Sequence, residues 1–110
     1  MTTAAVQTSA ENGSIRIRLS GEVGLANVAT VEEEIINSVP DQATAVSVDL
    51  TDLTYMDSAG VSILFSLATQ LQKLQITLEL IVPLDSPTRR LIELSGFESL
   101  ATLRPATNEI

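Results

Sequence analysis

The sequence predicts a single α/β domain built on a mixed β-sheet. After an opening pair of strands, segments with helical apolar spacing alternate with segments of strand-like spacing, an order typical of layered α/β domains. The chain has 110 residues, of which 45% are apolar, enough to form one hydrophobic core. We find no internal repeat and no linker. We therefore expect one domain over residues 1–110, with its core in about 14–104.

The first two strands are expected to pair as a hairpin. Residues 4–9 are predicted to form an edge strand, and the Asn-Gly pair that follows is a turn signal because it readily supplies positive φ. Residues 14–20 then alternate between apolar and polar side chains, so every second residue should face the core. Arg16 and Arg18 fall on the opposite face, where we interpret them as solvated strand positions.

The first helix is expected to follow a loop at residues 21–24. It should start at Asn27 or Thr30, and Thr30 with Glu33 three residues later fits a capping box. A run of three glutamates would then lie in the first turns, where negative charge suits the helix dipole. Three consecutive helical residues cannot all face one ion, so this run does not predict a metal site. The helix should end near residue 38.

A central strand at residues 45–50 should lead through a turn into a long helix at 59–74. Asp57 and Ser58 lie at the junction, and either can act as the N-cap. We expect the Ser58 hydroxyl to be exposed, because connections between strand and helix run over the surface. On local chemistry alone, the pair does no more than cap a helix.

The helix at 59–74 has an unusually wide apolar face. A contact with one sheet needs an apolar stripe of only about 100°, so the second stripe should meet a neighbouring helix or, as an alternative, a partner. The two stripes comprise Val61, Leu64, Phe65 and Ala68, and Ile63, Leu67, Leu71 and Leu74.

The remaining predicted elements are an inner strand at 76–82, a short helix at 89–94, a strand at 100–103 and a tail at 105–110. The inner strand is almost continuously apolar, as expected where both faces are largely covered. Ser86 and Pro87 have the pattern of an N-cap and first helical residue. Gly96 is placed to end the short helix.

The composition leaves little room for an enzyme. The chain has no histidine and no cysteine, which excludes a Ser-His-Asp triad and metal sites built on imidazole or thiolate. Its only lysine, Lys73, lies roughly 20 Å along the helix from Ser58, too far for a Ser–Lys pair. No phosphate-binding loop is present. We expect no enzymatic activity, no cofactor and no metal.

Three aspartates suggest one alternative, a magnesium-dependent phosphoacceptor like that of response regulators. Asp49, Asp52 and Asp57 could supply carboxylates. Those receivers also carry an acidic pair after the first strand and a lysine on a late loop, and this chain has neither. This alternative is therefore disfavoured.

The charge and the N-terminal sequence bear on partners and location. A net charge of −8 with six basic residues repels nucleic acid and anionic membranes and suits a basic protein surface. The chain opens without a basic start or an apolar block, and its apolar runs are far too short to span a membrane. We expect a cytoplasmic protein with no nucleic-acid partner and no membrane insertion.

One stretch carries a family resemblance. Tyr-Met-Asp57-Ser58-Ala-Gly60 before an apolar helix, with Leu-Ser-Gly-Glu-Val ahead of Leu25-Ala-Asn27 upstream, resembles the STAS domain of bacterial anti-sigma factor antagonists. Residues 78–82 and 89–97 are similar to that family's last strand and helix. The resemblance covers about residues 14–104. It implies a STAS-like fold, a mixed sheet with helices packed mainly on one face.

The resemblance also implies a function. In that family the serine after the aspartate is phosphorylated by the anti-sigma factor, a serine kinase of the histidine-kinase-like ATPase type. The unphosphorylated protein binds this kinase and frees a sigma factor, and a PP2C-type phosphatase resets it. Ser58 is the implied phosphoacceptor. A phosphate on Ser58 should meet free N–H groups at the start of the helix, so we expect the helix to tolerate it. The implied partner-binding residues are Gly21, Glu22, Gly24, Leu25, Asn27, Asp57, Ser58, Ala59 and Gly60.

The sequence departs from the family at one position. The family usually has aspartate at the fourth position of its Gly-Glu-Val-x loop, and here that residue is Gly24. Glycine adopts positive φ freely, so we expect a loop of different shape. The rival function is a STAS scaffold, either a stressosome component or a cytoplasmic subunit of a lipid transporter, which needs no switch. Retention of Ser58 favours the switch.

Overall fold

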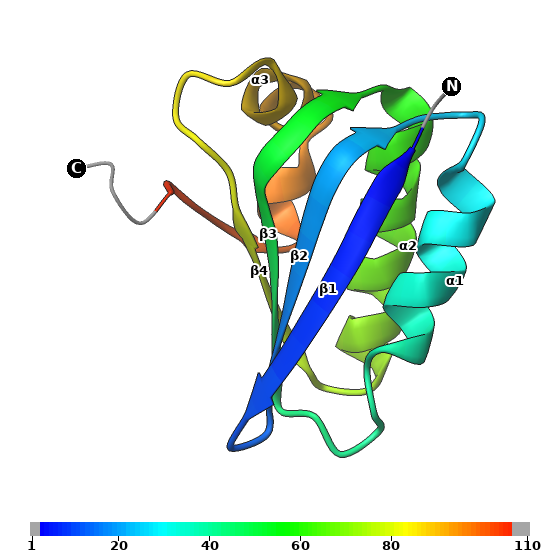
Figure 1. Cartoon of the computed structure of the whole chain (residues 1–110). Coiled ribbons are helices and arrows are strands. Elements are labelled where there is room, and N and C mark those ends of the chain that lie inside the picture. Colours follow the sequence, from blue (N-terminus) through cyan, green and yellow to red (C-terminus); the bar gives the residue numbers. More distant parts are fainter. Residues whose placement is uncertain (1–2, 107–110) are drawn as a thin grey trace.

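The computed structural model describes residues 3–106 and contains a five-stranded sheet covered by helices (Figure 1). The strands are β1 (Ala4–Glu11), β2 (Ser14–Val23), β3 (Ala45–Met56), β4 (Thr77–Ile81) and β5 (Thr102–Arg104). The helices are α1 (Val28–Asn37), α2 (Ser58–Lys73), α3 (Pro87–Leu94) and the short 3-10 helix η1 (Phe97–Ser99). The strand order is β1-β2-β3-β4-β5. β1 is antiparallel to β2 and the other pairs are parallel, so the predicted mixed sheet is confirmed.

The helices share one face of the sheet. Side chains from β2 (Ile17), α2 (Leu64), α3 (Ile92) and η1 (Phe97) belong to the same buried cluster. The Phe97 ring meets Phe65 of α2 edge-on, with ring centroids 4.9 Å apart. A common core of this kind requires α2, α3 and η1 to cover the same side, as the sequence predicted, and α1 lies beside α2 (Figure 1).

The hairpin at the start of the chain forms as expected. Asn12 and Gly13 have φ values of 52° and 85°, the positive angles that a tight two-residue hairpin turn needs. β1 and β2 pair from Glu11↔Ser14 to Ala4↔Gly21. β1 is the edge strand that the sequence predicted.

The opposite face of the sheet carries a charged cluster around Asp49. This aspartate is only 5% exposed. Its Oδ2 accepts a 2.9 Å hydrogen bond from Arg16 Nη2, its Oδ1 accepts a 3.0 Å bond from the Thr51 N–H, and Arg18 Nε lies 3.8 Å away. The arginines are about half exposed, but they pair with Asp49 rather than being simply solvated. Burial raises the pKa of Asp49, and the hydrogen bonds from Thr51 and Arg16 outweigh it, so the pKa lies below its ordinary value.

This cluster predicts an acid-sensitive contribution to stability. Because the folded pKa of Asp49 lies below its ordinary 3.8, the carboxylate stabilises the fold above that value and loses its contribution as the pH falls through the folded pKa. We expect Asp49→Asn to lower the free energy of unfolding by about 1–3 kcal/mol near pH 7, toward the low end because Arg16 is half exposed. Urea unfolding across the acid range should show this difference shrinking.

A matched control separates the cluster from a general effect of charge. Asp41, in the loop before β3, is exposed, and Asp41→Asn should change stability by less than about 0.5 kcal/mol. An Asp49→Asn deficit that persists unchanged in acid would show that the carboxylate charge is not what stabilises this cluster.

β3 is longer than predicted. The expected turn after residue 50 is wrong, since the strand continues to Met56. The register with β2 shifts twice, between Arg18 and Ser20 and between Gly21 and Glu22, and each time β3 supplies one extra residue. Such bulges bend a strand, and β3 curves visibly in Figure 1. The core-facing residues are spaced by two and then by three, at Val46, Val48, Leu50, Leu53 and Met56, and this spacing is the sequence signal for the bulges.

α1 starts with Asn27 as its N-cap, the first of the two predicted positions, whereas the residues before it differ from the prediction. β2 extends through Val23, so residues 21–23 belong to a strand rather than a loop. α1 begins at Val28 with Asn27 as N-cap residue, which places Thr30 inside the helix. The predicted capping box is therefore wrong, and the glutamate run lies beyond the first turn. The predicted end near residue 38 is confirmed, with Ser38 as C-cap.

α2 buries both of its apolar stripes. Six of the eight predicted residues are buried, namely Val61, Ile63, Leu64, Leu67, Ala68 and Leu71. Leu67 and Leu71 line a cavity of about 100 Å³ together with Ile36 and Val39 at the end of α1. The second stripe therefore meets a neighbouring helix, as predicted, while Leu74 remains 47% exposed just after α2 ends.

The C-terminal elements follow the sequence closely. Ser86 Oγ accepts a 3.1 Å bond from the Arg89 N–H, with Pro87 as the first residue of α3. Gly96 has φ 81°, the left-handed conformation of a helix-ending glycine. β5 starts two residues later than expected because η1 takes up part of the connection. Of the predicted tail at 105–110, residues 107–110 lie outside the described part of the chain.

Candidate functional site

The candidate site lies at the C-terminal ends of β2 and β3, where α1 and α2 begin (Figure 1). β2 and β3 are parallel, and their last residues, Val23 and Met56, are partners in the ladder. The loop at 24–27 and the start of α2 therefore leave the sheet side by side. The structure thus brings together two stretches that are more than thirty residues apart in the sequence.

Asp57 links the two stretches through one carboxylate. Its Oδ1 accepts hydrogen bonds from the N–H groups of Ala59 (3.0 Å) and Gly60 (3.2 Å), which makes Asp57 the N-cap of α2. Its Oδ2 accepts a 3.2 Å bond from the Leu25 N–H in the neighbouring loop. The same side chain therefore caps the helix and fixes the loop beside it.

Gly24 makes room for this carboxylate. A Cβ at position 24 would lie 2.8 Å from Asp57 Oδ2 and 3.4 Å from Tyr55 Cε2. Gly24 is not among the glycines with positive φ in the described chain, so the expectation that a positive φ reshapes the loop is wrong. The residue is small because another side chain occupies the space in front of it.

Asn27 closes the loop. Its Oδ1 accepts a 3.0 Å bond from the Gly24 N–H, and its Nδ2 donates a 2.9 Å bond to the Glu22 carbonyl. No side-chain cap bond comes from Asn27, because its amide is used within the loop. It holds the turn that places Leu25 at the surface.

Gly60 and Gly21 each lie where a neighbouring segment leaves no room for a Cβ. A Cβ on Gly60 would lie 2.7 Å from Met56 Cγ and 3.2 Å from the Val23 carbonyl, so the first turn of α2 packs tightly on the strand ends. Gly21 has φ 88°, and a Cβ there would meet the Thr3 carbonyl at 2.5 Å. Gly21 therefore lies close against the backbone that leads into β1, and the fold requires glycine at this position.

Ser58 is exposed as the first residue of α2. Among the hydrogen bonds found in residues 3–106, none involves its hydroxyl, while its carbonyl accepts a 3.0 Å bond from Ser62 Oγ. The N–H groups that follow it are occupied, since Asp57 binds those of Ala59 and Gly60 and its carbonyl binds that of Val61 at 3.1 Å. The expectation that a phosphate would meet these N–H groups free is therefore wrong.

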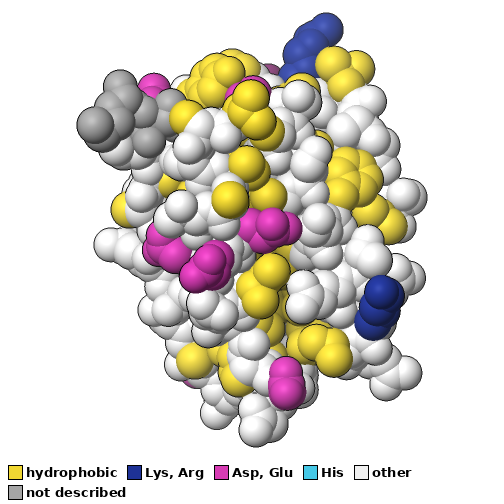
Figure 2. All heavy atoms as spheres, turned by 90° about the vertical axis from the view of Figure 1, so that its right-hand side faces the viewer, with side chains coloured by type: hydrophobic (Ala, Val, Ile, Leu, Met, Phe, Trp, Pro, Cys, Tyr) yellow, Lys and Arg dark blue, Asp and Glu magenta, His cyan; other side chains and the backbone are white. Residues whose placement is uncertain are grey.

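Two exposed apolar side chains belong to the same region. Leu25 is 80% exposed and Tyr55 is 50% exposed. The Leu25 N–H bonds Asp57, and the Tyr55 ring lies near Gly24. The sequence reasoning included Leu25 but missed Tyr55, whose position directly before the Met-Asp-Ser motif was the available signal. Acidic side chains interrupt the apolar ones across the helix face, and basic side chains lie at its margins (Figure 2).

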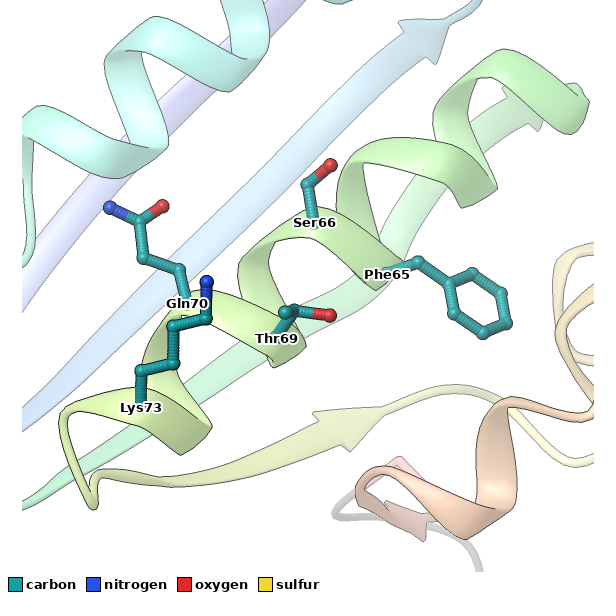
Figure 3. Close-up of a pocket in the computed structure, with 5 residues that line it drawn as sticks. All are labelled: Phe65, Ser66, Thr69, Gln70 and Lys73. Carbon is teal, nitrogen blue, oxygen red and sulfur yellow. The ribbon is translucent and has the colours of Figure 1, made fainter.

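The exposed side of α2 offers no enclosed ligand site. An open depression of about 640 Å³ is lined by Phe65, Ser66, Thr69, Gln70 and Lys73, and Phe65 points toward η1 (Figure 3). Within residues 3–106, no group of three or more acidic, histidine or cysteine side chains could hold a metal ion. None of the helices in this range has the length and hydrophobicity needed to cross a membrane.

Comparisons with known proteins identify the family. The model of the STAS domain matches residues 5–110. The chain is 32% identical over 94 residues to the anti-sigma-F factor antagonist RsfB of Mycobacterium tuberculosis, covering 84% of this chain and 75% of the relative.

Solved structures agree with this assignment. An anti-sigma factor antagonist from Mycobacterium paratuberculosis superposes with a TM-score of 0.84 at 24% identity, covering 96% of this chain and 89% of that one. The anti-sigma factor antagonist SpoIIAA in its unphosphorylated form gives a TM-score of 0.73 at 25% identity, covering 94% and 90%. The predicted fold is therefore confirmed, and the chain belongs to the STAS domain family.

Proposed function

We propose that this protein is an anti-sigma factor antagonist controlled by phosphorylation of Ser58. In its unphosphorylated form it binds an anti-sigma factor, a serine kinase with a histidine-kinase-like ATPase fold, and so releases a sigma factor. The kinase phosphorylates Ser58 and ends the interaction, and a PP2C-type phosphatase restores it. The similarity to the anti-sigma factor antagonists RsfB and SpoIIAA supports this function, and SpoIIAA has also been solved in a phosphorylated form.

One observation carries the proposal, namely the presentation of the Ser58 hydroxyl. A kinase needs an accessible hydroxyl, and Ser58 is exposed at the start of α2. The exposed side chains of Leu25 and Tyr55 flank the region and give a partner apolar surface to bury. The protein acts as a binding module over residues 1–110, without cofactor or metal.

The rival function, a STAS scaffold without a switch, needs none of these features. A scaffold could bury or hydrogen-bond Ser58 at no loss. The exposed and unbonded hydroxyl therefore favours the switch over a stressosome component or a transporter subunit.

A capture experiment tests the proposal. Tagged wild-type chain should retain an ATPase-fold serine kinase from extracts of its own host, and phosphosite mass spectrometry after addition of ATP should place phosphate on Ser58. Ser58→Ala should bind the same kinase and stay unphosphorylated. Ser62→Ala, one turn further along α2, is the matched control and should be phosphorylated normally. Retention of transporter or stressosome subunits, with no phosphate on Ser58, would establish the scaffold function.

A further inference from the structure

We propose that Asp57 is a positioning residue that holds the side chain of Leu25 beside Ser58 as an apolar anchor for the anti-sigma factor. This inference rests on the proposed function and adds to it the residue that organises the docking surface. It also assigns a role to Gly24, which keeps the space that Asp57 needs.

The geometry shows why an aspartate is suited to this position. Three N–H groups converge on its carboxylate, two from the first turn of α2 and one from Leu25. Ser, Thr, Asn and Asp all make good helix N-caps, so capping alone does not select aspartate. Two acceptor oxygens pointing in different directions are needed to bond the helix and the loop together.

Gly24 provides the space from the loop side. Its missing Cβ would lie 2.8 Å from Asp57 Oδ2, closer than real side chains approach. A Cβ at position 24 requires the carboxylate or the loop to shift, and either movement disturbs the bond between Asp57 and the Leu25 N–H. The glycine and the aspartate therefore form one arrangement, in which the Tyr55 ring also lies against the loop backbone.

The consequence of this arrangement falls on Leu25. Its side chain is 80% exposed and therefore packs little within the domain, whereas its backbone N–H is bonded to Asp57. A loop that is ordered before binding saves the partner the entropy of ordering it. If loss of the bond left the loop competent only a tenth of the time, the apparent Kd would rise about tenfold.

The test compares Asp57→Asn with wild type. An amide has one oxygen, so asparagine can keep the helix cap but then turns its NH₂ toward the Leu25 N–H, donor against donor. We expect faster hydrogen exchange of the Leu25 amide by NMR and a Kd for the purified, captured anti-sigma factor kinase that is about tenfold weaker. The melting temperature should stay close to that of wild type. Asp41→Asn, which removes the same charge from an exposed loop at the other end of β3, should change neither measurement.

A double-mutant cycle distinguishes positioning from loss of charge or of structure. If Asp57 acts through Leu25, Asp57→Asn should weaken binding in the wild-type background and add little in a Leu25→Ala background. Gly24→Ala should reproduce both the faster exchange and the weaker binding, since it displaces the carboxylate from the other side. The substitutions at Asp57 and Gly24 both leave the Leu25 side chain itself unchanged.

Other results would overturn the inference. Unchanged exchange of the Leu25 amide in Asp57→Asn would show that the bond does not hold the loop. Equal loss of affinity in both backgrounds would show that Asp57 acts on the partner directly. If wild type fails to bind any anti-sigma factor kinase, the proposed function fails and the docking role fails with it, whereas wild-type binding that the variants leave unchanged removes only the inference.

Discussion

Leu64→Ala is expected to lower the free energy of unfolding by about 2–5 kcal/mol, the usual range for a buried leucine. Leu64 is fully buried in the middle of α2, in the core that the helices share with the sheet. Removing its isobutyl group leaves a cavity among rigid neighbours that cannot all move to fill it. The total free energy of unfolding of a domain is about 5–15 kcal/mol, so this single change would remove a large part of it. Urea unfolding monitored by circular dichroism measures it.

Leu25→Ala is the matched control, because it makes the same chemical change at a side chain that is 80% exposed. Its effect on stability should lie within about ±0.5 kcal/mol. A loss below about 1 kcal/mol for Leu64→Ala would contradict the packing described for α2.

Ser58→Asp is expected to leave the fold intact and weaken binding of the anti-sigma factor by about 100-fold or more. A partner that packs over the neutral Ser58 hydroxyl would have to bury the charge of the aspartate instead, and an unpaired buried charge costs several kcal/mol. A 100-fold change in Kd corresponds to about 2.7 kcal/mol, so this cost is large enough to produce it. Phosphate, with about −1.5 to −2 charges near pH 7, should act at least as strongly. Titration calorimetry with the purified kinase gives the ratio.

The position of Asp57 explains why the helix should survive this change. Asp57, not Ser58, caps α2, so a charge on Ser58 removes no cap. It also gains little from the helix start, since the Ala59, Gly60 and Val61 N–H groups are already bonded. The new charge lies next to the Asp57 carboxylate, and their repulsion favours an orientation toward solvent, where the partner docks.

Ser66→Asp adds the same charge two turns further along the exposed side of α2 and should cost much less affinity than Ser58→Asp. Equal affinities for the phosphorylated and unphosphorylated protein would leave the scaffold function. A Ser58→Asp protein that is grossly unfolded would contradict the assignment of Asp57 as the cap.

Local patterns predicted much of the fold. Alternation located β2 and the start of β3, an Asn-Gly pair located the hairpin turn, and Ser86-Pro87 located α3. These signals work because each depends on neighbours in the sequence. The errors fell at the ends of β2 and β3, where pairing between distant residues decides the structure. Strand pairing extended β3 past the expected turn and β2 through Val23, and of the two predicted helix starts the structure has Asn27 rather than Thr30.

The candidate site was predictable only in part. The family resemblance implied that the loop before α1 and the start of α2 belong together, and the structure places them side by side. It could not show that the Asp57 carboxylate bonds Leu25, or that Asp49 binds Arg16. Such contacts depend on ladder register and on side-chain direction, and neither can be derived from the spacing of residues along the chain.

The two bulges of β3 set where the strand ends relative to β2. Between Val48 and Met56 the strand uses eight steps where β2 uses six, from Ile17 to Val23. Losing one of the two extra residues would remove one bulge and keep the other. It would also shift the end of β3 by about 3.3 Å relative to β2. This shift is about as large as the length of the hydrogen bond between the Leu25 N–H and Asp57, which is 3.2 Å. Small deletions here should therefore yield chains that fold but no longer bond Asp57 to the loop at 24–27, whereas the loop at 38–44 can change length without that effect.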